Sequence, residues 1–532
     1  MVGVSDRENA AGERDTSLAL RRRATLVDAV VCVALALVAV DVSLMNWQLY
    51  HQDVDVFMAI SRRMVAGQVI YRDFWMAYPP GLFFLYAGLM KLFGASHQVI
   101  KLSAVVLFAP MPPAIYLVVR RYASVGAALF AGVLSIAAYP PSHKVIVPLL
   151  SVIALWTVAS LSSGSTRSRT LRAGVAVGLA VLFKHEFGFL LSLVLLACLW
   201  FAPVEAALAV RSRPTRIGWY LVGIALPLLP VIGYFWYRAA LRALAYDVIV
   251  DPFYSAAGMS TSIKPPFAGG LSAMLSGWQQ EVVSHVVYLA PLAYGGIMLG
   301  TARSVLGRRS DDRSFFLFFG SLVGWAMLVN WVSRTDFPHV RQGILPLFVL
   351  AAIGLDGLLR GLRGRVPGSP FRLAGAAIIV AYGVWFAAAG LSGRALLPSS
   401  ARLRQINSVP QRLARVVAYV STHVGRTETV FAVPRVMDVY NLTGRLNPFT
   451  YGDLFPGVFG RHPREAEAAL VEEVRQKADV VVLDTTPWTA GPGRSELSEY
   501  APQVSAFITQ ECRPVATVAN RFVILRRIHP RR

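Results

Sequence analysis

The sequence predicts a polytopic α-helical membrane protein that ends in a small α/β domain. Its 532 residues are 55% hydrophobic and 15% charged, with a mean hydropathy of +0.52, whereas a soluble globular chain is about 25% charged. Apolar runs of about 20 residues, the length that spans a bilayer, recur through residues 21–393. From residue 394 to residue 532 the composition is that of a soluble domain. These observations exclude a large soluble enzyme and a disordered protein.

Eleven apolar runs are predicted to be transmembrane helices. A further run, 78–94, is short, begins next to two prolines and carries Lys91 near its end. We expect this run to lie as a helix in the outer interface of the bilayer rather than to span it. The eleven predicted spans cover residues 26–45, 99–119, 124–140, 144–162, 171–184, 187–205, 217–236, 283–301, 315–332, 340–359 and 372–392.

The basic residues predict the orientation of the chain. If 78–94 does not span, the main arginine clusters of the loops all fall on one face, which the positive-inside rule makes cytoplasmic. The N-terminus, polar and expected to be disordered over residues 1–20, is then inside, and the C-terminal domain is outside. The net charge of +22 is therefore attributed to topology, and no nucleic-acid partner is expected. The clusters lie at residues 21–23, 120–121, 167–172, 211–216, 303–313 and 360–372.

Residues 394–532 are predicted to form an extracytoplasmic α/β domain. Three runs rich in β-branched residues, 429–433, 479–483 and 521–525, are typical of strands. Residues 463–477 have helical spacing and pair acidic with basic side chains one turn apart.

The cysteines indicate neither disulfides nor a metal centre, because Cys32, Cys198 and Cys512 lie far apart in the sequence. No cofactor is indicated by a motif. A divalent metal is left open, since acidic residues alone do not define a metal site.

Ionisable residues gather in the loops of the predicted outer face. A charged group at membrane depth is costly and is therefore a functional candidate. Lys and Arg can hold a phosphate, and a carboxylate can accept a proton from an attacking hydroxyl. Each residue alone has a simpler explanation as a solvated loop, an interfacial polar group or a structural ion pair, but their convergence favours one site. The candidates are Asp53 and Asp55, Tyr71, Arg72, Asp73 and Tyr78, His143 and Lys144, Lys184, His185 and Glu186, and Arg334, Asp336 and His339, with Asp247 and Asp251 in a further outer loop.

The first outer loop, 46–98, carries a pattern that resembles a known family. The pattern resembles the C superfamily (GT-C) of integral membrane glycosyltransferases, in particular the bacterial group of the lipid A aminoarabinose transferase and, more distantly, the protein O-mannosyltransferases. The resemblance covers most of the chain. It rests on Asp53-Val54-Asp55-Val56-Phe57, Gly67, Tyr71-Arg72-Asp73-Phe74 and Tyr78-Pro79-Pro80-Gly81, and more weakly on Phe183-Lys184-His185-Glu186-Phe187-Gly188 and Arg334-Thr335-Asp336-Phe337-Pro338-His339.

This resemblance implies an enzyme of the cytoplasmic (inner) membrane that takes part in cell-envelope or cell-wall biosynthesis. It would transfer a sugar, with inversion, from a polyprenyl-phosphate donor to a hydroxyl of a glycan, lipid or protein acceptor on the outer face. A first-loop carboxylate would be the general base, Asp53 or Asp55. Lys184, with Arg334 or His339, would hold the lipid phosphate, and the other candidates would bind substrate.

Two alternatives remain at this point. A transporter or flippase for lipid-linked sugars predicts ionisable residues near mid-membrane and repeated halves, whereas no repeat is evident and the polar residues lie near helix ends. A non-catalytic subunit that binds lipid-linked sugars would have the same sequence features as the enzyme.

Overall fold

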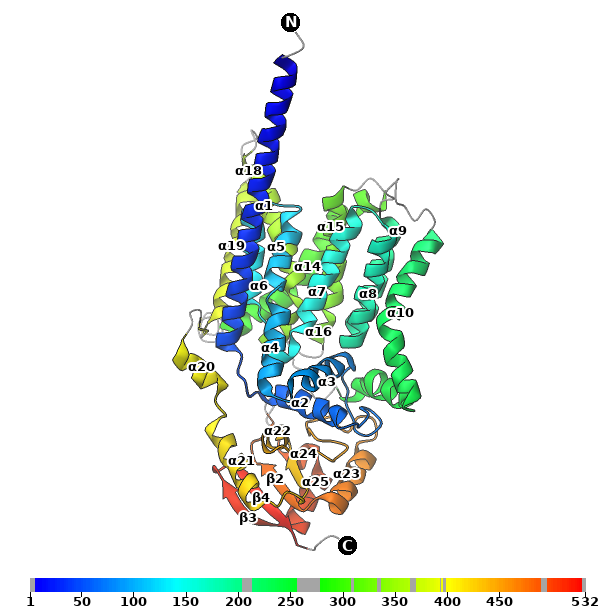
Figure 1. Cartoon of the computed structure of the whole chain (residues 1–532), viewed down its shortest axis with the longest axis vertical. Coiled ribbons are helices and arrows are strands. Elements are labelled where there is room, and N and C mark those ends of the chain that lie inside the picture. Colours follow the sequence, from blue (N-terminus) through cyan, green and yellow to red (C-terminus); the bar gives the residue numbers. More distant parts are fainter. Residues whose placement is uncertain are drawn as a thin grey trace.

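The structure is a computed structural model that describes residues 5–202, 213–255, 278–307, 311–332, 336–363, 370–392, 394–395, 399–488 and 495–528. A bundle of long helices occupies one end of the molecule, and a small mixed α/β domain occupies the other (Figure 1). Between them, two short helices run across the end of the bundle. The predicted fold class, a polytopic helical protein with a small C-terminal sheet, is confirmed.

The predicted spans correspond to helices of the bundle. Eight segments of the described chain are long and apolar enough to cross a membrane. The remaining three, α6, α8 and α9, have 13, 17 and 17 residues and stand upright beside the longer helices (Figure 1). The bundle consists of α1 (Ser5–Asn46), α4 (His97–Phe108), α5 (Met111–Arg120), α6 (Val125–Ala137), α7 (Ile146–Ser162), α8 (Arg167–Phe183), α9 (His185–Phe201), α10 (Arg213–Tyr237), α14 (Trp278–Leu306), α15 (Asp312–Met327), α16 (Val329–Val332), α18 (Leu345–Arg363) and α19 (Pro370–Leu391).

Three boundaries differ from the expected ones. Helix α1 begins at Ser5, so most of the segment expected to be disordered is helical, in keeping with its good helix formers Ala, Glu and Arg. The span expected at 99–119 is divided between α4 and α5 at Pro110, which has no N–H to continue the helix. The span expected at 340–359 begins only at Leu345, because Asp336 caps a separate short helix, α17 (Phe337–Gly343).

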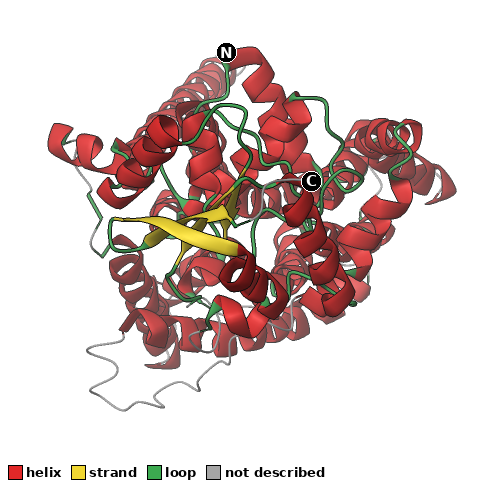
Figure 2. Cartoon of the chain, turned by 90° about the horizontal axis from the view of Figure 1, so that it is seen from below, coloured by secondary structure: helices red, strands yellow, loops and turns green. Residues whose placement is uncertain are grey.

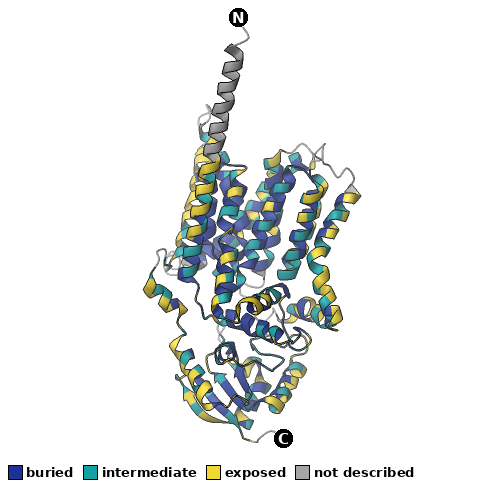
Figure 3. Ribbon diagram, in the orientation of Figure 1, coloured by how far each residue is buried: buried dark blue, intermediate teal, exposed yellow. Residues whose placement is uncertain are grey.

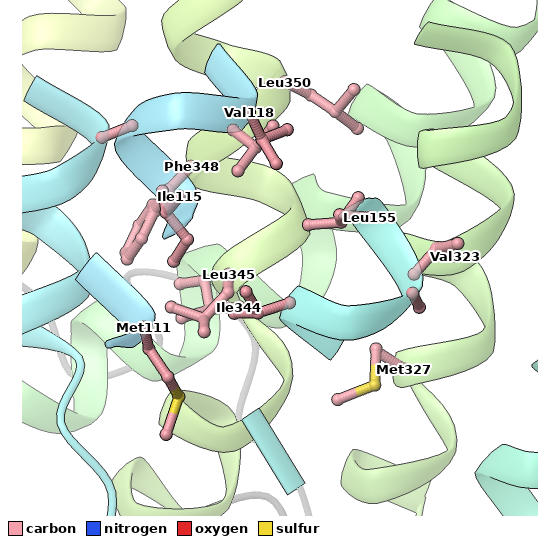
Figure 4. Packing of buried hydrophobic residues seen from close by; sticks show 14 of the residues in the cluster. Met111, Ile115, Val118, Leu155, Val323, Met327, Ile344, Leu345, Phe348 and Leu350 are labelled. Carbon is pink, nitrogen blue, oxygen red and sulfur yellow. The ribbon is translucent and has the colours of Figure 1, made fainter. Parts of the chain in front are cut away.

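The bundle core is formed where α5, α7, α15 and α18 meet. Figure 4 shows Ile115, Leu155, Val323 and Phe348 pointing into this common centre, and all four are buried. The described parts of α1 and α10 are largely exposed on their outer faces (Figure 3), and the exposed residues include leucine, valine and tryptophan. Such an apolar exterior suits contact with lipid chains, which is consistent with a multi-pass membrane protein.

Helix α2 (Gln52–Val65) and helix α3 (Gly81–Phe93) form the layer between the bundle and the C-terminal domain, here named the cross layer. The run 78–94 therefore contributes a short helix, α3, that lies across the end of the bundle rather than upright within it (Figure 1). Helix α2 donates side-chain hydrogen bonds to the C-terminal domain from Gln52 to the carbonyl oxygen of Arg435 (2.8 Å) and from Arg62 to that of Tyr440 (2.9 Å). These contacts fix the α/β domain over α2.

Several short helices lie beside the cross layer at the same end of the bundle. A 3₁₀ helix, η1 (Ser142–Lys144), precedes α7, and α17 precedes α18. After α10 the chain forms α11 (Leu241–Ala245), the π-helix η2 (Tyr246–Val250) and α12 (Pro252–Ser255).

The C-terminal domain, from α20 to β4, is built on one four-stranded sheet in the order β1-β2-β4-β3, which lies across the view from below in Figure 2. Strand β1 pairs in parallel with β2, and β4 pairs antiparallel with β2 and β3. The elements are α20 (Ser400–Asn407), α21 (Gln411–His423), β1 (Val430–Val433), α22 (Met437–Thr443), α23 (Pro463–Lys477), β2 (Val480–Asp484), α24 (Leu497–Tyr500), α25 (Pro502–Glu511), β3 (Cys512–Val518) and β4 (Phe522–Arg527).

All three predicted strands and the predicted helix are present as β1, β2, β4 and α23. Strand β3 was not predicted. It is an edge strand that contains Pro514 and an irregular register there, and most of its side chains are exposed. Pro is tolerated at such an edge but removes the sequence signal of a strand.

Helices α8 and α10 approach each other through two glycines. A Cβ atom at Gly174 would overlap the carbonyl oxygen of Tyr220, and one at Gly223 would overlap that of Leu171. Small residues let the backbones of membrane helices pack this closely.

We therefore expect Gly223→Ala to lower the stability of the protein by about 1–3 kcal/mol, because the added methyl group forces α8 and α10 apart. Gly233→Ala is the matched control, since it lies on the same helix and its Cβ would meet open space. Thermal unfolding of the detergent-solubilised protein measures both. An equal loss of stability in the two variants would contradict the close-contact explanation.

Candidate functional site

The first turn of α2 places Asp53 at the end of the bundle. His51 is the N-cap residue of this helix, and its Nδ1 accepts a hydrogen bond from the backbone N–H of Asp53 (3.2 Å). An acidic side chain in the first turn is stabilised by the positive end of the helix dipole. The local sequence therefore explains both the start of α2 and the position of its first carboxylate.

The carboxylate of Asp53 lies between cationic and imidazole groups. Its Oδ1 is 2.7 Å from Nη2 of Arg435, and its Oδ2 is 3.3 Å from Nε2 of His143. Burial acts to raise the pKa of Asp53, but His143, Arg435, His51 and Lys144 outweigh it and hold the pKa well below its ordinary value. The side chain is 36% exposed, so an ionised carboxylate remains accessible.

Asp53 lines a cavity of about 120 Å³ between the cross layer, η1 and the C-terminal domain. The aromatic side chains of Trp75, Phe455 and Trp488 line one part of it, and the guanidinium of Arg435 lies over the Trp488 ring at 4.9 Å. We name this space the Asp53 cavity. Its polar lining residues are Asp53, Tyr78, His143, Lys144, Arg435 and Asp453.

Asp55 has a different environment from Asp53. Its side chain is fully buried, and its Oδ1 lies 2.6 Å from Nε2 of His97 and accepts a hydrogen bond from Nδ2 of Asn441 (2.9 Å). Burial, followed by the charge of Asp55, raises the pKa of neighbouring Asp438 well above its ordinary value. Asp55 therefore joins α2 to α4 and α22, and it does not line the Asp53 cavity.

Three predicted candidates form one chain of contacts into the Asp53 cavity. Lys144 Nζ lies 2.8 Å from Nε2 of His339, and Nδ1 of His339 lies 2.5 Å from Oδ1 of Asp336. The same carboxylate caps α17 by accepting the backbone N–H of His339 (3.0 Å). Arg334, predicted beside these residues, lies outside the described part of the chain.

Lys184, His185 and Glu186 form a separate group at the turn between α8 and α9. Lys184 Nζ lies 3.0 Å from Oε1 of Glu186, and Nδ1 of His185 lies 3.3 Å from Oε2. None of the three lines the Asp53 cavity. The turn is nevertheless close to the cross layer, because Gly81 at the start of α3 packs against Leu182.

The Tyr71-Arg72-Asp73 segment stabilises the first loop and stays outside the Asp53 cavity. Tyr71, in the left-handed region at φ 72°, donates its hydroxyl to the carbonyl oxygen of Tyr78 (2.7 Å). Asp73 pairs with Arg72 (2.7 Å) and accepts the backbone N–H of Val69 (2.7 Å). Of this group of predicted candidates, only Tyr78 reaches the cavity.

Sequence reasoning missed the residues that the C-terminal domain and Trp75 contribute to the cavity. Arg435 follows β1 by two residues, and Asp453 lies 2.9 Å from its Nε. Ligand-binding residues often follow the carboxyl ends of parallel strands, so the predicted strand 429–433 offered a signal for Arg435. Trp75, whose Nε1 donates to Asp251 (2.8 Å), offered no comparable signal.

His51, Asp53 and His143 could together hold a divalent metal ion. One ligand atom from each lies within 4.8 Å of the others. Two imidazole nitrogens and one carboxylate oxygen are a donor set that suits Zn²⁺ better than Mg²⁺. Neither ring nitrogen of buried His143 forms a hydrogen bond with the described residues, so both remain able to coordinate an ion.

The two first-loop carboxylates should differ in what they contribute to stability. Asp55→Asn removes the charged partner of His97 in a buried cluster and should cost about 3 kcal/mol or more. Asp53→Asn, at a half-exposed position, should cost no more than about 1 kcal/mol. Thermal unfolding of the two isosteric variants measures the difference. Equal losses of stability would contradict the assignment of Asp55 to a buried cluster and of Asp53 to an accessible cavity.

Comparison with family models and with curated protein sequences finds no match. Among solved structures, the chain is similar to ArnT from Cupriavidus metallidurans, whose crystal structure is bound to undecaprenyl phosphate. The TM-score is 0.55 at 14% sequence identity, and the match covers 93% of this chain and 97% of that chain. The chain therefore has the fold of the GT-C aminoarabinose transferase ArnT, as the first-loop residues predicted.

Proposed function

We propose that this protein is a GT-C glycosyltransferase that takes a sugar from a polyprenyl-phosphate donor at the end of the bundle beneath the C-terminal domain. The observation that carries this proposal is the accessible, ionised carboxylate of Asp53 in a cavity that also presents Lys144 and Arg435. The shared fold supports it, because ArnT of that fold binds undecaprenyl phosphate.

Asp53 is the proposed general base. The acceptor hydroxyl attacks the anomeric carbon of the donor sugar while the bond from that carbon to the phosphate oxygen breaks. The hydroxyl proton passes to Asp53, and polyprenyl phosphate leaves with the bonding electrons. Attack from the face opposite the phosphate inverts the anomeric configuration. Asp55, buried against His97, is instead a positioning residue for α2.

The cations around Asp53 also explain why Asp53 would become a stronger base only after the donor binds. Arg435 and Lys144 lower the basicity of Asp53 while no anion is bound. A donor phosphate beside these cations would compete for their charge and raise the pKa of Asp53, which makes it a better base when substrate is present. The same cations stabilise the negative charge that develops on the leaving phosphate.

The remaining candidates support donor binding around this centre. His339 and Asp336 orient Lys144 through the contacts described above. Lys184, His185 and Glu186 lie beside α3 and are proposed to contact the donor nearer its lipid chain. Trp75, Phe455 and Trp488 offer apolar faces against which the C–H groups of a sugar ring can pack. The acceptor is proposed to be a hydroxyl of a cell-envelope glycan, lipid or protein.

Turnover with a polyprenyl-phosphate sugar tests the role of Asp53. In purified protein, Asp53→Asn should lower kcat by at least about 100-fold, the usual contribution of general-base catalysis, with donor affinity largely kept. Glu472→Gln, an exposed change on α23, should leave turnover unchanged. Wild-type turnover by Asp53→Asn would remove the proposed base, and donor binding without turnover in the wild type would favour a non-catalytic binding protein.

Adding a metal chelator to the same turnover assay distinguishes Asp53 as a general base from Asp53 as a metal ligand. If Asp53 acts as a metal ligand with His51 and His143, turnover is lost on chelation and restored by Zn²⁺. Turnover that is insensitive to the chelator supports the direct base.

The orientation is proposed to place the cytoplasm at the end of the bundle away from the C-terminal domain. We expect Ser421→Cys on α21 to react with an impermeant thiol reagent in intact cells, and Ser168→Cys at the start of α8 to be protected. Both positions are exposed in the folded chain, and the native cysteines are replaced in this background. Labelling of Ser168→Cys with protection of Ser421→Cys would reverse the orientation.

A further inference from the structure

A second cavity, of about 260 Å³, shares His51 and His143 with the surroundings of Asp53 but contains no carboxylate among its described lining residues. It lies where the end of α1, the segment before η1, α17 and the start of the C-terminal domain meet. We name it the arginine pocket. Its lining residues that matter here are Trp47, Tyr139, His143, Arg341, Arg394 and Arg402.

Arg341 is the central group of the arginine pocket. Its side chain belongs to α17, is only 5% exposed, and lies over the rings of Phe337 (4.8 Å) and Tyr139 (5.4 Å). Its Nε and Nη1 atoms are buried and form no hydrogen bond with any described residue. Burial of a charged group without its hydrogen-bond partners is costly, and unsatisfied buried donors call for an explanation such as an unseen anion.

Two further guanidinium groups line the same pocket. Arg394 lies 5.1 Å from the ring of Tyr139, so Arg341 and Arg394 share one aromatic neighbour and repel each other. Arg402 donates to the carbonyl oxygen of Met45 (3.3 Å) and to the side chain of Gln405 (3.0 Å). Neither of these partners carries a charge, so three positive charges converge without a counterion among the described lining residues.

The carboxylate of Asp336 has other partners besides Arg341. Asp336, close enough to influence Arg341, has its Oδ1 within 2.5 Å of His339 and accepts the backbone N–H that caps α17. Burial, with a contribution from Arg394, lowers the pKa of Arg341 to about 10, while a side-chain hydrogen bond with Tyr139 and the charge of Asp336 act to raise it, so Arg341 stays protonated at neutral pH.

The walls of the arginine pocket are held by hydrogen bonds. Asn46 donates to the carbonyl oxygen of Ala395 (2.8 Å) and accepts its backbone N–H (2.9 Å), which positions the residue beside Arg394. Trp47 Nε1 donates to the carbonyl oxygen of Pro140 (2.8 Å), which positions the segment beside Tyr139. The arginines therefore lie around a formed space.

We propose that the arginine pocket binds a phosphate group, at a site separate from the Asp53 cavity and divided from it by His143. Arginine binds phosphate through paired N–H donors and charge, and a bound phosphate would supply acceptors for Nε and Nη1 of Arg341. The phosphate can belong to a lipid headgroup or be free inorganic phosphate. The site does not require Asp53 to be a catalytic base.

Binding to the full-length protein, purified in neutral detergent and phosphate-free buffer, tests this site. Isothermal titration calorimetry measures the binding of inorganic phosphate and, separately, of a short prenyl phosphate. The matching prenyl alcohol is the uncharged control. At least one of the two phosphates should bind, and Arg341→Gln and Arg402→Gln should each weaken that binding at least tenfold. Arg404→Gln, an exposed arginine on the same helix as Arg402, should bind like the wild type.

Further variants separate this site from the proposed enzyme centre. Asp53→Asn and Lys144→Gln alter the Asp53 cavity and should keep phosphate binding in the arginine pocket. If Arg341→Gln does not fold, as judged by its melting temperature, the proposal is tested by the phosphate affinity of Arg402→Gln. Preference for prenyl phosphate assigns a lipid headgroup, and equal affinity assigns free phosphate.

Three results would overturn the proposal. The first is wild-type affinity in both arginine variants, and the second is binding of neither phosphate to the wild-type protein. Loss of binding in Lys144→Gln but not in Arg341→Gln would move the phosphate to the Asp53 cavity and equally exclude the arginine pocket.

Discussion

The buried carboxylate of Asp55 joins three parts of the molecule that are distant in sequence. It contacts His97 at the start of α4 and Asn441 in α22, and it is itself part of α2. A buried charge is tolerated only when it is paired and hydrogen-bonded, so this cluster requires the bundle, the cross layer and the C-terminal domain to be assembled together. Asp53, two residues earlier on the same helical turn, depends on that assembly for its position.

The same constraint on charge explains why ionisable side chains lie near the ends of the bundle. Hydrocarbon cannot solvate ions, and the described core of α5, α7, α15 and α18 is apolar. Ionisable side chains are instead paired where the helices end, including the end away from the C-terminal domain, where Arg120 pairs with Asp28 and Arg360 with Asp356. The Lys144–His339–Asp336 contacts, the Asp53–Arg435 pair and the Lys184–Glu186 pair all lie at such ends.

Two polar spaces with opposite character adjoin His143. The Asp53 cavity combines carboxylates with cations and aromatic rings, whereas the described lining of the arginine pocket consists of cationic, aromatic and neutral groups. His51 stacks on His143, with ring centroids 5.4 Å apart. His143, which lines both spaces, therefore forms a physical boundary between the two proposed sites.

Composition and periodicity were sufficient for the helical bundle and for three of the four strands, because these features depend on local hydrophobicity and on side-chain type. The first-loop residues were sufficient for the fold of GT-C glycosyltransferases. The different environments of Asp53 and Asp55 could not be predicted, because only the position of His97 and Asn441 buries one of two carboxylates on the same helical turn. Arg435 was missed although the predicted strand 429–433 offered a signal for it. Trp488 and Arg341 could not be predicted as site residues, because they come from segments hundreds of residues away from α2, and local sequence contains no information about such pairings.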